Sequence, residues 1–188
     1  MSVPPDASAG SVDAVAILLD DHNKINQHFR EFRLLYLAGG LAEAERVAQQ
    51  ICRELTIHTT LEEEIFYPEA RAAIDTPKLV DEAKARHAIA REFIAQIMGG
   101  FIADKIYAAR VGMLGEYVSH HVREEQQELF PRVRQSELDM NEIGARMLAR
   151  KLDLEAEIGA ADRNGVIQRG GADGDAGGQG SSASRAAG

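Results

Sequence analysis

The chain has 188 residues, an ordinary apolar content of 45% and a formal charge of −9, so it is long enough for one domain with a sizeable core. The acidic balance argues against nucleic acids and anionic membrane surfaces as partners, since both attract basic patches. One cysteine, Cys52, excludes an internal disulfide framework, and no signal peptide or membrane-spanning stretch is visible, so we expect a cytoplasmic protein.

The first half of the chain predicts two long helices. Residues 1–10 are rich in Pro, Ser and Ala and are predicted to be disordered. Ser11 is a candidate cap for a helix that ends at Gly39-Gly40, with apolar residues at helical spacing. A second helix follows over residues 41–74. Pro68 lies inside it, removes a backbone donor and therefore predicts a bend or fraying there.

The second half predicts three further helices, over residues 77–98, 104–134 and 139–158. Residues 159–188 are mostly Gly, Ala, Ser, Asp and Arg, a composition that predicts a disordered tail. The fold class is therefore all-α. Long helices with short turns favour an up-down-up-down four-helix bundle over residues 11–158, with an additional short C-terminal helix and two disordered tails.

Two segments of the sequence are nearly alike. His58 and Glu62 are followed by Pro68, and His121 and Glu125 are followed by Pro131, at the same spacings. Residues four apart lie on one face of a helix, roughly 5–6 Å apart. Each segment therefore presents an imidazole and a carboxylate in the same direction, as a metal site requires.

Two more histidines complete the pattern at the same level of the bundle. His22 lies 17 residues before Gly39 and His58 lies 18 after Gly40, so the two are at nearly equal height in an antiparallel hairpin. His87 is placed similarly opposite Glu62. The predicted metal ligands are His22, His58, Glu62, His87, His121 and Glu125.

This ligand set indicates a pair of transition-metal ions. Imidazoles with carboxylates suit iron, manganese or zinc rather than calcium or magnesium. Six ligands exceed what one tetrahedral zinc needs. Two metals bridged by Glu62 and Glu125, each with two histidines, would use every ligand and leave open positions for a small molecule.

The arrangement resembles the hemerythrin-like family of HHE cation-binding domains. The resemblance lies in Asp21-His22, in His58-x3-Glu62 through Pro68, in His87, and in His121-x3-Glu125 through Pro131, and it covers residues 11–158. It implies a four-helix bundle with two iron ions in a non-haem, carboxylate-bridged centre. Arg91 stands where oxygen-carrying members have a further histidine, which disfavours reversible oxygen storage.

The leading function is thus binding or sensing of oxygen, nitric oxide or peroxide. The alternatives are a peroxide-consuming di-iron oxidoreductase and a non-catalytic helical interaction module that uses the C-terminal helix or tail. No catalytic residue is assigned. The sequence leaves the natural ligand, the metal in the cell and the oligomeric state open.

Several other residues of the helices are interpreted as having no direct metal contact. His28 is expected to flank the site, and His120 to lie at the surface or to support a ligand. Cys52 and Tyr117 are expected to pack in the core, with a role of Tyr117 near the metals, as ligand or proton donor, as the alternative. Four glutamates are expected to be solvated, with a bond to a ligand imidazole as the alternative: Glu63, Glu64, Glu124 and Glu128.

Overall fold

The computed structural model describes the backbone of residues 13–170 and the side chains of residues 13–161. All regular elements in this part of the chain are helical. Two of the long helices contain a short π-helical segment, named η1 and η2, and each is continuous through it. The elements are α1 (Ala14–Leu37), α2 (Leu41–Leu61), η1 (Glu62–Phe66), α3 (Tyr67–Ala73), α4 (Lys78–Met98), α5 (Tyr107–Glu124), η2 (Glu125–Leu129), α6 (Phe130–Gln135) and α7 (Met140–Gly170).

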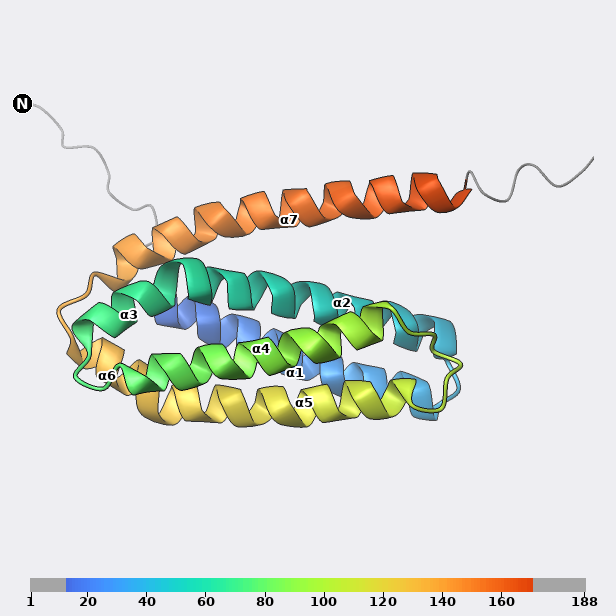
Figure 1. Cartoon of the computed structure of the whole chain (residues 1–188), viewed down its shortest axis with the longest axis horizontal. Coiled ribbons are helices and arrows are strands. Elements are labelled where there is room, and N and C mark those ends of the chain that lie inside the picture. Colours follow the sequence, from blue (N-terminus) through green and yellow to red (C-terminus); the bar gives the residue numbers. More distant parts are fainter. Residues whose placement is uncertain (1–12, 171–188) are drawn as a thin grey trace, which may run out of the picture.

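Four rods lie side by side, and α7 packs along the outside of them (Figure 1). The rods are α1, α2 with α3, α4, and α5 with α6, and successive rods run in opposite directions. This confirms the predicted up-down-up-down bundle. Within residues 13–170, no helix is both long and apolar enough to cross a membrane.

The ends of α1 are fixed by local chemistry. Asp13 caps its first turn, where the carboxylate Oδ1 accepts a hydrogen bond from the Ala16 amide at 2.9 Å. The predicted cap, Ser11, lies outside the described residues. At the other end Gly39 has φ of 81°, a conformation that favours glycine, and the Gly40 amide donates to the Leu35 carbonyl to close the helix.

The helices that contain Pro68 and Pro131 remain continuous, and a π-helical turn lies directly before each proline. The bend or fraying predicted at Pro68 is therefore replaced by a wider helical turn. The Tyr67 amide donates to the carbonyl of Glu62, five residues earlier, and the Phe130 amide does the same to Glu125. Proline has no amide hydrogen to continue the ordinary ladder, and an i→i+5 turn directly before it keeps the helix continuous. Both π-helical segments begin at a predicted glutamate ligand.

The fifth helix is longer than predicted. Asp139 caps it as expected, accepting from the Asn141 and Glu142 amides at 2.9 and 3.0 Å. It then continues to Gly170, past the predicted boundary at residue 158. The few apolar residues after residue 158 make burial of this segment unfavourable, but they do not prevent it from being helical. A glycine inside a helix costs only about 1 kcal/mol, so a helix that has already formed can extend through it. The predicted disorder of residues 1–10 and 171–188 lies outside the described residues.

The hydrophobic core consists of two clusters on either side of the predicted ligand layer. One contains Leu18, Leu61, Phe66 and Met147 and includes residues from α7. The other lies toward the α1–α2 turn and is built around residues such as Leu114. The ligand layer therefore sits in the middle of the bundle, with apolar packing above and below it.

Candidate metal centre

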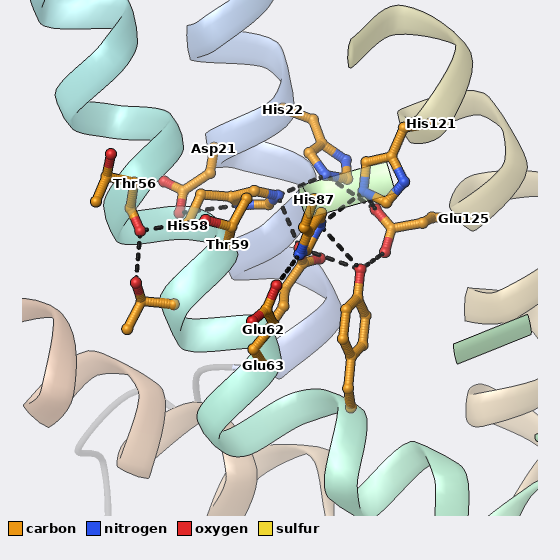
Figure 2. A network of polar contacts seen from close by, with 12 residues as sticks. Asp21, His22, Thr56, His58, Thr59, Glu62, Glu63, His87, His121 and Glu125 are labelled. Atoms are coloured by element: carbon orange, nitrogen blue, oxygen red, sulfur yellow. Dashed lines mark hydrogen bonds and ion pairs between the residues drawn. The ribbon is translucent and has the colours of Figure 1, made fainter. Parts of the chain in front are cut away.

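The structure brings the six predicted ligands together in one buried layer, each at most 6% exposed. In Figure 2 the four imidazoles converge between the two glutamates. Two groups of these side chains have ligand atoms close enough to share a cation. They are His22, His58, Glu62 and Glu125, and Glu62, His87 and His121.

Each helical hairpin contributes a pair of imidazoles. The Nε2 atoms of His22 and His58 are 3.1 Å apart, as are those of His87 and His121. Two nitrogens bound at about 2.1 Å to one metal lie about 3.0–3.4 Å apart at tetrahedral or octahedral angles. The two pairs therefore fit two separate metal ions.

The glutamates lie between the two histidine pairs. Glu62 Oε2 is 3.2 Å from Nε2 of both His58 and His87. Glu125 Oε2 is 3.4 Å from Nε2 of both His22 and His121. Each carboxylate therefore faces one histidine of each hairpin and could be shared by cations held at the two histidine pairs.

Several polar atoms of this layer lack a hydrogen bond among the described residues. They include Glu62 Oε1 and Glu125 Oε2, both fully buried. An unpaired buried carboxylate oxygen is costly, and most such atoms in proteins have a partner. A bound cation would satisfy them, so the donor set fits the metal pair that the sequence predicted.

Burial shapes the protonation of the layer. It lowers the pKa of His58 to about 4 and that of His87 to about 2, and it also lowers the pKa of His121. The rings are therefore neutral at pH 7, as metal ligation requires. Burial and the neighbouring charge of Glu125 raise the pKa of Glu62 well above its ordinary value. Glu62 therefore holds a negative charge unfavourably until a cation compensates it.

Arg91 has a structural role at the edge of this layer. Its guanidinium donates to Glu63 Oε1 at 2.7 Å, and the same oxygen lies 2.9 Å from His87 Nδ1. A carboxylate at Nδ1 fixes the ring so that Nε2 faces the metal position. Glu63 is therefore the exception among the glutamates expected to be solvated, and Arg91 holds it in place.

Tyr67 is the site residue that the sequence did not reveal. Its fully buried hydroxyl donates to Glu125 Oε1 at 2.7 Å and lies 3.3 Å from both Glu62 Oε2 and His87 Nε2. Phe130 occupies the matching place of the repeat and stacks on His22, with ring centroids 5.9 Å apart. A comparison of the two repeats would have flagged this tyrosine, because it is the polar member of the pair.

The remaining side chains lie where they were expected. His28 pairs with Glu54 at 2.9 Å, away from the centre, and His120 is exposed. Cys52 is buried, and burial raises the pKa of its thiol to about 12, which makes it an unreactive packing residue.

A small cavity lies on the histidine side of the layer. It is lined by all four predicted ligand histidines and by apolar side chains such as Ile25, Leu55 and Val118. Tyr117 also lines it, so this residue borders the centre as well as packing. The cavity volume is about 10 Å³, close to the minimum that holds one water molecule. It therefore has room for about one water molecule.

A four-helix bundle with two histidine pairs and two glutamates between them is typical of a class of metal-binding proteins. The family model described as the hemerythrin HHE cation binding domain matches residues 13–133, more than half of the chain. The chain belongs to this family and is a metal-binding hemerythrin-like protein.

The chain is similar to two known proteins. It is similar to a hemerythrin HHE cation binding domain-containing protein from Mycobacterium kansasii, with a TM-score of 0.65 and 19% identity over 78% of this chain and 89% of that one, which shows the shared fold. It is also similar to a DNA nickase of Nostoc sp. strain PCC 7120, with 32% identity over 117 residues. These residues make up 61% of this chain. The chain spans 31% of the length of that relative.

Proposed function

We propose that the protein holds two iron ions in a carboxylate-bridged, non-haem centre and there binds or senses oxygen, nitric oxide or peroxide. One observation carries the proposal. Each glutamate faces one imidazole of each hairpin, at 3.2 Å for Glu62 and 3.4 Å for Glu125. Four nitrogens and two bridging carboxylates leave open positions on both ions. When bound, the ions would supply reversible redox chemistry and these open positions.

The surroundings of the layer support a small ligand. The cavity of about 10 Å³ beside the histidines has room for about one water molecule, so it favours a very small ligand over a larger substrate. The apolar residues that line it favour a neutral ligand. The chain's own residues thus orient the metals, exclude bulk water and select by size.

The decisive experiment measures metal content together with anaerobic and aerobic optical spectra. The wild type is expected to bind two irons per chain, and the spectrum is expected to change on exposure to oxygen, nitric oxide or peroxide. His58→Ala and Glu125→Ala are expected to lose metal. His28→Ala is the matched control, because His28 is a partly buried histidine of α1 that pairs with Glu54 instead. Stoichiometric zinc with no spectral response would refute the redox function.

Turnover of peroxide is the second candidate, and Tyr67 favours it. Its hydroxyl is hydrogen-bonded to Glu125 inside the ligand layer, so the pair could relay a proton to and from a reacting oxygen. Burial and the charges of Glu125 and Glu62 raise the pKa of Tyr67 well above its ordinary value, so the hydroxyl would regain a proton from one side as it gives one to the other. Conversion of two peroxides to oxygen and two waters needs such transfers and no outside reductant. Oxygen evolution over many cycles would distinguish this enzyme from a sensor, which changes its spectrum once.

The activity named for the Nostoc relative is not part of this proposal. The chain spans 31% of that protein. Its formal charge of −9 also disfavours DNA as a partner.

A further inference from the structure

Helix α7 lies beyond the residues that match the family domain, yet it forms ion pairs with the bundle close to the ligand layer. Three of its basic side chains form ion pairs there. Arg146 pairs with Glu69 at 2.7 Å, and Arg150 pairs with Glu64 at 2.8 Å. Lys151 pairs with Asp21 at 2.5 Å. Asp21 is the buried one of these three carboxylates, so the third pair differs in kind from the other two.

Asp21 stands directly behind a predicted metal ligand (Figure 2). Its Oδ2 lies 3.9 Å from His58 Nδ1, and both atoms are buried without a hydrogen bond among the described residues. A metal on Nε2 leaves the proton of the ring on Nδ1, which then needs an acceptor. Asp21 Oδ2 is the carboxylate oxygen available to it, and a small rotation would close the gap.

The position of Lys151 on α7 directs it to this carboxylate. It follows Met147 by four residues and precedes Leu154 by three, and both of these side chains are buried against the bundle. Residues at this spacing share one face of a helix. Lys151 therefore interrupts an apolar stripe, and its ammonium group reaches Asp21 Oδ1 at the edge of a cavity of about 340 Å³.

His87, a predicted ligand from the other hairpin, has the same order of groups behind it. His87 Nδ1 contacts Glu63, and Glu63 in turn is held by Arg91. His58, Asp21 and Lys151 repeat this order of imidazole, carboxylate and cation. In the first case all three groups belong to the four-helix bundle, whereas in the second the cation comes from α7.

We propose that Lys151 is a positioning residue of the metal centre, which holds Asp21 so that this carboxylate orients His58 toward its metal. Helix α7 would then contribute to metal binding and not only to the packing of the bundle. The inference rests on the proposed function, since it requires a metal at the His22–His58 pair. It predicts an asymmetric effect, because His87 and His121 have no contact with α7 through this chain of groups.

The test compares Lys151→Met with Arg146→Met in the full-length chain loaded with ferrous iron under anaerobic conditions. Both variants remove one cation of α7 that pairs with the bundle, but Arg146 pairs with the half-buried Glu69, whose side chain is 35% exposed, whereas that of Asp21 is 8% exposed. The measurements are bound iron per chain, the rate of iron release to a ferrous chelator, and the optical spectrum. Lys151→Met is expected to release one of its two irons about 3–10-fold faster, somewhat less than the loss typical of a direct partner of a ligand. Its spectrum is expected to shift.

Two further variants keep the inference open to refutation. Lys151→Arg retains the cation and is expected to restore the wild-type release rate. Asp21→Asn, expected to speed release of the same iron, serves if Lys151→Met does not fold. Equal release from Lys151→Met and Arg146→Met would overturn the inference while the di-iron proposal stands. A wild type that binds fewer than two metals would instead refute the proposed function itself.

Discussion

Removal of the Tyr67 hydroxyl tests how the chain controls the charge of its buried layer. Tyr67→Phe deletes one oxygen and leaves the ring, which is fully buried, in place. The lost hydrogen bond to Glu125 Oε1 measures 2.7 Å. Burial, which by itself would raise the pKa of Glu125, is outweighed by His121 and His22, which lower it, so the acceptor is a carboxylate.

The expected cost follows from the charge of the acceptor. A hydrogen bond to a charged group contributes about 1.5–3 kcal/mol, and its loss leaves a buried oxygen without a partner. For a domain of this size that corresponds to a melting temperature about 3–12 °C lower. The loss is expected in the metal-free protein, where no cation compensates Glu125.

The assay is urea denaturation and thermal melting of the metal-free protein, with Tyr107→Phe as the control. Tyr107 is buried to the same extent but belongs to the cluster on the other side of the layer. If both variants lose the same stability, or Tyr67→Phe gains some, the assignment of Glu125 as a charged acceptor is wrong. In the iron-loaded protein the same variant is expected to lower oxygen evolution from peroxide without loss of iron, provided that the protein turns over peroxide.

Two further predictions concern stability. Burial and then the charge of His121 lower the pKa of His87 to about 2, so the stability that its neutral ring contributes is full above the unfolded pKa of about 6.5 and is lost as the pH falls. Between pH 7 and pH 5 the metal-free wild type is expected to lose roughly 2 kcal/mol more than His87→Gln, by urea denaturation at each pH. Gly112→Ala is expected to stabilise α5 by about 0.5–1 kcal/mol, because a Cβ at Gly112 meets nothing within 4 Å. Gly115→Ala is expected to be less stable than Gly112→Ala in the same assay, since its Cβ would lie 3.1 Å from the Phe29 ring.

The ligand layer could be predicted from the sequence because its geometry depends on local rules. Four-residue spacing places His58 with Glu62 on one face, and the distance of His22 from its turn sets its height. In the structure the two histidines meet at 3.1 Å. Regular helices and short turns make this counting reliable from α1 to α4, whereas the longer connection at residues 99–106 breaks it, and His121 was predicted from the repeated motif instead.

Tyr67 escaped the same rules because the helix is not regular where it lies. At 3.6 residues per turn, residues five apart point about 140° away from each other. The π-helical turn that begins at Glu62 bonds residues five apart and so brings Tyr67 to the same side. A regular helical period in the sequence cannot predict this π-helical turn, and the proline after it predicts only an interruption of the helix.

Contacts between distant helices were equally out of reach. Nothing in the spacing of Arg91 or Lys151 shows that each holds a carboxylate behind a histidine. Such pairs depend on how two helices are rotated against each other, and long side chains can reach many neighbours.

The contacts of Glu62 and Glu125 with histidines of both hairpins have a consequence for folding. Each hairpin is local in the sequence, and its own histidine pair needs no other part of the chain. Glu62 and Glu125, in contrast, face imidazoles of both hairpins. Two bound ions would act as cross-links between the halves, so that parting the hairpins breaks bonds at both ions together. Metal loading then adds stability to contacts between the two halves, which cost more entropy to close than the contacts within each hairpin.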